Sequence, residues 1–170
     1  MSILSGPEIR RQMGLGAITC TPEPANIGPN SMDLRLGDKL FMYSRYELDA
    51  SRPAPDLAEV RAAERGWLLL PGRLYLGATL ERVCARGFVP WLDGRSSLGR
   101  LGVSAHITAG RGDNGFDGNW TLEISVVQPV WLQPHGRYFQ MSFFTIEGEP
   151  EVYAGRYQSS TGVVGSRMAT

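Results

Sequence analysis

Residues 66–83 read GWLLLPGRLYLGATLERV, and this stretch is the clearest indication of the fold class. Two leucine-rich runs flank a Pro-Gly turn signal, which is typical of short strands rather than of a long helix. The segments that follow are equally rich in Val, Ile, Leu and aromatic residues, with Gly, Pro or Asp between them. They are FVPWLDGRS (88–96), VSAHITAG (103–110), NWTLEISVVQPVWLQP (119–134) and RYFQMSFFTIE (137–147). This spacing predicts a mainly β protein, an antiparallel barrel or jelly-roll sandwich rather than βαβ units.

The N-terminal third of the chain carries weaker signals. Ser5 and Glu8 have the spacing of a capping box, which predicts a short helix through Met13 that stops at the following glycines. MDLRLGDKLFMY (32–43) alternates like a pair of strands broken at Gly-Asp, and LAEVRAAERG (57–66) is compatible with one or two helical turns. We therefore expect one short helix before the β-rich part.

Length and charge exclude several classes of protein. The chain has 170 residues, enough for one domain with a core, and 17 basic residues balance 17 acidic ones. A net charge of zero argues against general attraction to nucleic acid or to a membrane surface. Cys20 and Cys84 form neither a disulfide framework nor a CxxC pair, and we find no apolar signal core or membrane-spanning run. A cytoplasmic protein is the expectation.

GRSSLGRLG (94–102) combines cations, hydroxyls and flexible backbone in one place. Glycine lets a ligand approach the backbone, while serine hydroxyls, backbone N–H groups and arginine side chains bind anions. A polar turn between two strands would have the same composition, and these nine residues alone leave both interpretations open.

HITAGRGDNGFDGNWTLE (106–123) ends on a carboxylate inside an apolar strand. By alternation Glu123 shares a face with Thr121 and Ser125, opposite Leu122 and Ile124. Glu123 is therefore either an ordinary residue of a solvated strand face or a general acid–base group whose pKa burial raises toward neutrality. We expect His106 to be a hydrogen-bonded structural histidine and His135 to be a turn residue.

Several of these motifs together resemble the dCTP deaminases of the trimeric dUTPase superfamily. The resemblance rests on residues 94–102, on residues 106–123 and on the tail GRYQ…GVVGSR, with SMDLRLGD (31–38) and LLLPGRLYLGATLERV (68–83) in support. It covers nearly the whole chain in the right order. It implies a distorted jelly-roll, dUTPase-like β fold and a homotrimer whose active sites lie between subunits. It also implies hydrolysis of dCTP to dUTP and ammonia.

The resemblance assigns roles to individual residues. Glu123 matches the catalytic glutamate, Ser96 and Arg100 match its helpers, and the backbone carbonyl of Ala109 matches an acceptor for the attacking water. Asp113 matches the residue that receives the deoxyribose 3′-hydroxyl. The implied nucleotide contacts are Arg95, Ser96, Ser97, Leu98, Gly99, Arg100, Asp113, Thr121, Leu122, Glu123, Tyr153, Arg156 and Ser160.

The resemblance also bears on metals. The triphosphate would normally carry Mg²⁺, with no ligand supplied directly by the protein. Zinc deaminases activate water with a His/Cys cluster that ends in C-x-x-C, and this sequence has none. We therefore expect zinc-free deamination in which Glu123, Ser96 and Arg100 act on the water and the base.

The chain is expected to divide into a β domain (1–152) and a Gly/Ser-rich C-terminal arm (153–170) that orders over the nucleotide. The arm and the site depart from the family pattern at a few positions. Arg156 replaces a lysine, Ser160 a glutamine, Asn114 a proline, Gly112 a bulky apolar residue and Trp120 a smaller one.

Three alternatives stay open from the sequence. The first is a bifunctional enzyme that also hydrolyses its product to dUMP. The second is a dUTPase, although such enzymes usually carry an apolar residue at the position of Glu123. The third is a non-catalytic nucleotide-binding relative, or one that acts on a modified cytosine nucleotide.

Overall fold

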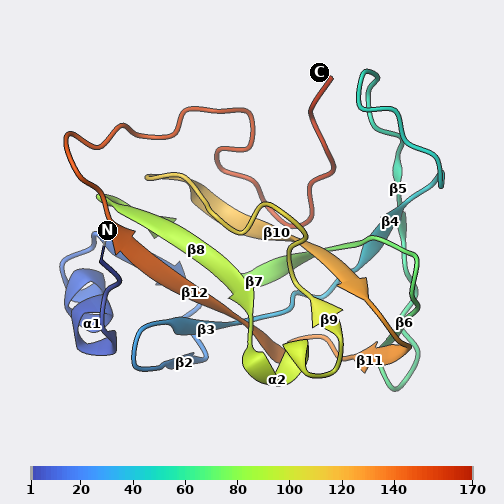
Figure 1. The fold of residues 1–170 in the computed structure, drawn as a ribbon, viewed down its shortest axis with the longest axis horizontal. Helices are drawn as coiled ribbons and strands as arrows, with labels where there is room; N and C mark the ends of the chain where they lie inside the picture. The colour runs from blue at the N-terminus through green and yellow to red at the C-terminus, as the bar shows by residue number, and fades with distance from the viewer. Residues whose placement is uncertain (1, 170) are drawn as a thin grey trace.

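Strand β7 lies at the centre of the larger sheet in the structure, a computed structural model that describes residues 2–169. The strands of this sheet are β1 (Ile18–Thr21), β4 (Phe41–Tyr43), β5 (Leu57–Glu59), β7 (Tyr75–Ala85), β9 (Val103–Ser104) and β10 (Asp117–Val126). β10 pairs antiparallel with β7 along one edge, and β1 and β4 pair with the other. Figure 1 shows β7 running behind β10 across the middle of the molecule. β7 therefore connects the N-terminal strands to the strand that carries Glu123.

A second sheet and a small ribbon complete the architecture. They contain β2 (Asn26–Ile27), β3 (Met32–Arg35), β8 (Phe88–Gly94) and β12 (Arg137–Thr145), with β6 (Trp67–Leu69) and β11 (Val130–Leu132) as the ribbon. Leu34, Leu122 and Phe139 are fully buried in the hydrophobic core, to which strands of both sheets contribute. The prediction of a mainly β, antiparallel fold from the segments after residue 66 is confirmed.

The two helices are short. α1 (Gly6–Gly14) begins after Ser5, whose hydroxyl accepts a hydrogen bond from the Glu8 N–H at 3.4 Å, so the predicted N-cap is confirmed. The reciprocal half of the capping box is wrong, because the Glu8 carboxylate binds Arg11 and Gln12 instead. α2 (Ser96–Gly99) is a single turn at the end of β8.

Two predictions for the N-terminal part need correction. Residues 57–66 contain strand β5 and a bridge between Ala63 and Gly66 rather than helical turns, because pairing with β4 outweighs the local preference. β3 and β4 are strands as expected, but they join different sheets instead of forming a pair. Within residues 2–169, no helix is long and apolar enough to cross a bilayer. Met1 and Thr170, the outer ends of the predicted domain and arm, lie outside the described residues.

Candidate functional site

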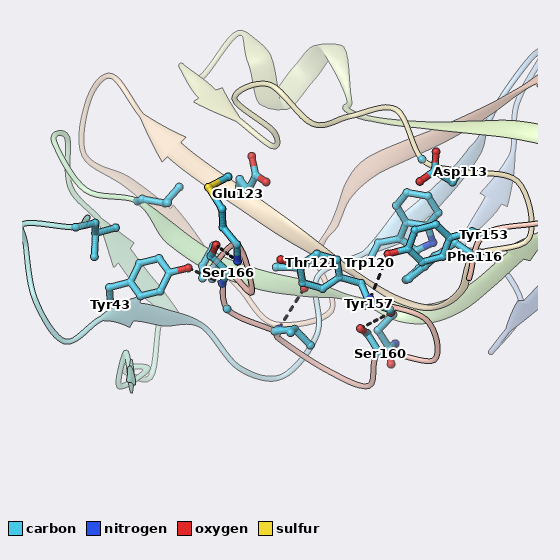
Figure 2. Close-up of a pocket in the computed structure, with 18 residues that line it drawn as sticks. Tyr43, Asp113, Phe116, Trp120, Thr121, Glu123, Tyr153, Tyr157, Ser160 and Ser166 are labelled. Carbon is cyan, nitrogen blue, oxygen red and sulfur yellow. Dashed lines mark hydrogen bonds between the residues drawn. The ribbon is translucent and has the colours of Figure 1, made fainter. Parts of the chain in front are cut away.

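A cavity of about 530 Å³ lies between β10 and the C-terminal arm. Its lining includes the predicted site residues Asp113, Thr121, Glu123, Tyr153 and Ser160. Figure 2 shows Asp113 at one end of this cavity and Glu123 well apart from it, with Thr121 between them. The structure therefore brings together five residues that the sequence had singled out from two separate segments, 106–123 and the C-terminal arm.

The alternation of β10 directs its polar side chains into the cavity. Residues 117–126 alternate between half-buried and buried, so Thr121, Glu123 and Ser125 share one face and Leu122 and Ile124 the other, as predicted. Leu122 is completely buried and faces the core, so only its backbone is available to a ligand.

An irregularity in β10 lies next to the cavity. The pairing with β7 shifts register between Asn119 and Thr121. At this shift the Thr79 hydroxyl replaces a backbone partner: it accepts a hydrogen bond from the Trp120 N–H at 3.0 Å and donates to the Glu81 carbonyl at 2.7 Å. Such a bulge re-aims side chains, and here it leaves the Trp120 indole and the Thr121 hydroxyl both lining the cavity.

The C-terminal arm covers β10 through a few hydrogen bonds. The Asn119 N–H donates to the Ser160 carbonyl at 2.9 Å, and the Gly162 N–H donates to the Asn119 side chain at 3.2 Å. Further along, the Val164 N–H donates to the Thr121 hydroxyl at 3.2 Å. In Figure 1 the arm, drawn in red, runs over β10 toward β5. The arm forms one wall of the cavity without adding a strand to the sheet.

Glu123 is half-buried and lies beside His106. The Nδ1 atom of His106 is 3.8 Å from the Glu123 Oε2 atom, beyond hydrogen-bonding distance but close enough for a charge interaction. His106 and the Ile107 N–H lower the pKa of Glu123, whereas burial raises it less. The prediction of a pKa raised toward neutrality is therefore wrong in direction. The carboxylate is ionised at neutral pH and can accept a proton.

His106 also differs from its prediction. Its side chain is buried, and neither ring nitrogen has a hydrogen-bond partner among residues 2–169. His135, by contrast, is the expected turn residue, with a left-handed backbone and a contact to Asp38.

Aromatic side chains surround the Asp113 end of the cavity. The Phe116 ring packs edge-on against Trp120 and Tyr153, with centroids 4.9 and 6.0 Å apart. A Cβ atom added to Gly112 would lie 1.9 Å from Cη2 of Trp120. The two departures from the family pattern therefore compensate each other, because Gly112 leaves the space that the Trp120 indole fills.

The remaining departures have structural explanations. The Asn114 side chain accepts from the Gly87 N–H at 2.7 Å and donates to the Glu151 carbonyl at 2.6 Å, which ties the β7–β8 turn to the segment just before the arm. Ser160 is buried, and its hydroxyl donates to the Tyr157 carbonyl at 2.6 Å. The Arg156 guanidinium contacts the Arg167 carbonyl within the arm. Asn114 thus fixes the segment that leads into the arm, whereas Ser160 and Arg156 stabilise turns within the arm.

The predicted phosphate-binding segment lies elsewhere in this chain. Arg95, Ser96, Ser97, Leu98, Gly99 and Arg100, together with Ala109 and Arg156, are absent from the cavity lining. Figure 1 shows α2 at the lower edge of the molecule, far from the arm at the upper edge. Leu98 is buried and anchors the turn, whereas Ser96, Ser97 and Arg100 are exposed.

Arg95 is held by neighbouring strands. Its Nε atom lies 3.4 Å from Oδ1 of the buried Asp33 on β3. One of its terminal nitrogens donates to the Arg137 carbonyl at 3.1 Å. The Arg137 side chain meets the other Asp33 oxygen at 3.5 Å. Asp33 thus orients two guanidinium groups at this end of the second sheet.

Sequence reasoning missed part of the cavity wall. Tyr43 and Leu48 come from β4 and the loop after it, Leu74 directly precedes β7, Leu76 lies within β7, and Met168 belongs to the arm. The Tyr43 hydroxyl accepts a hydrogen bond from the Ser166 N–H at 2.8 Å across 123 positions of sequence. No local pattern in the sequence signals a contact at such a separation.

The described residues offer little to a transition metal. Within residues 2–169 no three His, Cys, Asp or Glu side chains gather as a metal site would require. Cys20 and Cys84 are buried, and burial raises the pKa of the Cys20 thiol to about 12. Neither thiol has the electropositive, accessible surroundings of a reactive cysteine.

Comparisons with known proteins identify the family of this chain. A family model described as dCTP deaminase-like matches residues 3–146. A curated protein of Hathewaya histolytica named "dCTP deaminase, dUMP-forming" is 44% identical over 95% of this chain and 94% of its own. A protein of Rhodopirellula baltica named "dCTP deaminase" is 38% identical over 98% of this chain and 84% of its own.

Solved structures show a similar fold. The 2′-deoxycytidine 5′-triphosphate deaminase of Agrobacterium tumefaciens superposes with a TM-score of 0.64 at 22% identity, over 83% of this chain and 47% of that one. A dUTPase of Staphylococcus bacteriophage 80alpha superposes with a TM-score of 0.51 at 12% identity, over 82% and 96%. The distorted, dUTPase-like β fold predicted from the sequence is therefore confirmed.

Proposed function

The chain belongs to the dCTP deaminase-like family, and we propose that it deaminates dCTP and then hydrolyses the product to dUMP. Several relatives that are 42–44% identical over at least 95% of this chain carry the name "dCTP deaminase, dUMP-forming". Their names favour the bifunctional alternative over the simple release of dUTP. A relative at lower identity is named only "dCTP deaminase", so the second step needs its own test.

The observation that carries this proposal is the placement of Glu123. An ionised, half-buried carboxylate faces a cavity of about 530 Å³, and Asp113 lies at one end of that cavity. In the deamination, water adds to C4 of cytosine, N3 gains a proton, and the amino group leaves as ammonia. Glu123 would take one proton from the water and deliver it to N3. It would then transfer the remaining hydroxyl proton to the amino group, which leaves as ammonia while the C4 carbonyl forms. Asp113 would accept a hydrogen bond from the sugar.

Metal ions enter this proposal only with the substrate. Mg²⁺ would accompany the triphosphate, and proton transfer is assigned to Glu123 rather than to a zinc-bound hydroxide. Chelation by EDTA should inhibit, and added Mg²⁺ should restore the rate. Stoichiometric zinc in elemental analysis, with activity that depends on it, would contradict the zinc-free assignment.

We further propose that the working form is a homotrimer with sites shared between copies. The support is the separation of the two halves of the predicted site: α2 lies at the lower edge of the molecule, and none of residues 95–100 lines the cavity that Glu123 faces. In this arrangement Arg95, Ser96, Ser97 and Arg100 of one copy would reach the triphosphate bound against Glu123 of another. Exposed Leu101, Ile107 and Val127 would be covered in the trimer.

Mixing inactive variants tests the shared site. Glu123→Gln and Ser96→Ala proteins, each inactive alone, should regain part of the activity when they are dissociated and reassembled together. Trimers that mix the two variants contain some sites with an intact Glu123 and an intact Ser96. No recovery in verified mixed trimers, or full turnover by a monomer in light scattering, would refute the shared site.

A product assay tests the proposed function. Purified protein is incubated with dCTP and Mg²⁺, and the nucleotides are separated by anion-exchange chromatography. We expect ammonia, pyrophosphate and dUMP. Accumulation of dUTP would indicate a simple deaminase, and unchanged dCTP with turnover of added dUTP would indicate a dUTPase.

A further inference from the structure

His106 is a buried polar group without a visible function in the fold. Its side chain is only 8% exposed, and both ring nitrogens lack hydrogen-bond partners among residues 2–169. Buried imidazoles normally bind a backbone or side-chain group, because an unsatisfied donor or acceptor destabilises the folded state. A buried imidazole without hydrogen-bond partners beside the Glu123 carboxylate therefore points to a role other than packing.

The backbone holds His106 beside Glu123 from both sides. β9 pairs with β10 through Ser104 and Ser125, and the Glu123 N–H donates to the Ala105 carbonyl at 3.0 Å. The Ser104 hydroxyl donates to the His106 carbonyl at 3.0 Å. The residue that follows Ala105 is therefore fixed next to the side chain of Glu123, independently of any ligand.

The ring lies beside the carboxylate of Glu123. Nδ1 of His106 lies 3.8 Å from Oε2 of Glu123, a gap that a small change of rotamer would close to hydrogen-bonding distance. The Ser104 hydroxyl, on β9, is engaged with the backbone rather than with the ring. Among the described residues, Glu123 is the titratable side chain against which the structure places this ring.

We propose that His106 is a positioning residue for the reaction: its ring fixes the orientation of Glu123 and keeps the carboxylate in its charged, proton-accepting form. This inference rests on the proposed function, since it concerns the residue that would abstract the proton from water. His106 is not among the residues that line the cavity, so it would act through Glu123.

The pH dependence follows from the charges. His106 and the Ile107 N–H lower the pKa of Glu123, and burial opposes them. Without the ring, burial would dominate and the carboxylate would gain its proton at a higher pH. Since only the ionised form accepts a proton, the acid limb of the kcat profile should move to higher pH.

Two variants separate this role from simple packing. His106→Phe keeps a ring in the space but removes both nitrogens, whereas His106→Asn retains a donor near the position of Nδ1. We expect the acid limb to move up by about one pH unit in His106→Phe. His106→Asn should move it less, and KM for dCTP should change little in both. His135→Asn, which alters an exposed histidine far from the site, is the matched control.

A second measurement does not depend on activity. The chain has only two histidines, so ¹⁵N-histidine labelling of the His135→Asn protein reports His106 alone. We expect the His106 resonances to shift through the pH range in which Glu123 ionises, and that step to vanish in Glu123→Gln. An unchanged acid limb in a folded His106→Phe protein, or no Glu123-dependent step in the resonances, would overturn the proposal. If the wild-type protein shows no deamination, the proposed function fails, while the NMR titration still decides whether the two residues interact.

Discussion

Strand β10 and the C-terminal arm form opposite walls of the same cavity, but they are held in different ways. β10 pairs along its length with β7 and at its end with β9, and it buries every second side chain in the core. Residues 153–169 form no strand and cross β10 through isolated hydrogen bonds to Asn119 and Thr121. One wall is therefore part of the folded core, and the other rests on it.

This difference suggests separate roles for the rigid wall, β10, and the more easily released wall, the arm. Local opening is cheapest where few apolar contacts and few backbone hydrogen bonds must break. In the proposed function, the chemistry that needs a fixed geometry would take place on β10, where Glu123 and Thr121 lie. Closure over a nucleotide would fall to the arm, whose release would disturb little of the core.

Replacement of the carboxylate on the fixed wall should have the largest effect. Glu123→Gln keeps the shape of the side chain but cannot accept the proton from water. We expect the deamination rate to fall by about 10²–10⁴-fold, while nucleotide binding measured by calorimetry is retained. Deamination near the wild-type rate would remove Glu123 from its role, and Ser125→Ala on the same strand face is the control.

Removal of the arm should affect function more than folding. A chain truncated after Pro150 loses the wall that carries Tyr153, Tyr157 and Ser160 but keeps both sheets. We expect a folded protein whose activity falls by roughly a hundredfold, since the reacting groups lose their alignment. Activity assays and circular dichroism check the two halves of this expectation.

Hydrogen exchange with and without dCTP sharpens the same comparison. Fixing each residue of the arm costs about 1–2 kcal/mol of backbone entropy, which ligand contacts must offset. Residues 153–169 should gain protection on binding, whereas β10 should be protected in both states. Equal protection of the arm in both states would rule out a nucleotide-dependent closure.

Gly112 and Trp120, which fit against each other near Asp113, should be sensitive to substitution, and the effect should be on the stability of the fold. Gly112→Ala would push a Cβ atom into Cη2 of Trp120, and we expect a loss of about 1–3 kcal/mol in the free energy of unfolding. The double variant Gly112→Ala with Trp120→Val should recover part of this loss, as measured by urea denaturation. Equal stability of Gly112→Ala and wild type would show that the indole moves freely.

The smallest effect is expected at a strained position in the arm. Ser159 has a φ of 61°, in the left-handed region that glycine adopts more easily. Ser159→Gly should favour the docked arm by up to about 1 kcal/mol, visible as a lower KM for dCTP and slower exchange in the arm. Ser159→Ala, which keeps the strain, should show neither change.

Some features of this protein follow from local sequence alone. The period of two in residues 119–126 is enough to place Glu123 opposite Leu122, because successive side chains of any strand point to opposite faces. Ser5 begins the helix because its hydroxyl satisfies a backbone donor within three residues. The motifs at 94–102 and 106–123 likewise carried the family resemblance, because a motif is recognised from the order of its residues and does not require their positions in space.

Tertiary structure alone decided what those residues face. The direction of the Glu123 pKa depends on His106, which β9 brings alongside it, and burial by itself would have raised that pKa. Residues 57–66 contain a strand and a bridge because β4 supplies hydrogen-bond partners for β5, and a local sequence pattern does not predict such partners. The cavity needs Tyr43 and Ser166, 123 positions apart in the chain, to meet through one hydrogen bond. Periodicity acts over a few residues and fixes faces, whereas electrostatics and cavity shape arise from contacts between distant segments that only the folded chain brings together.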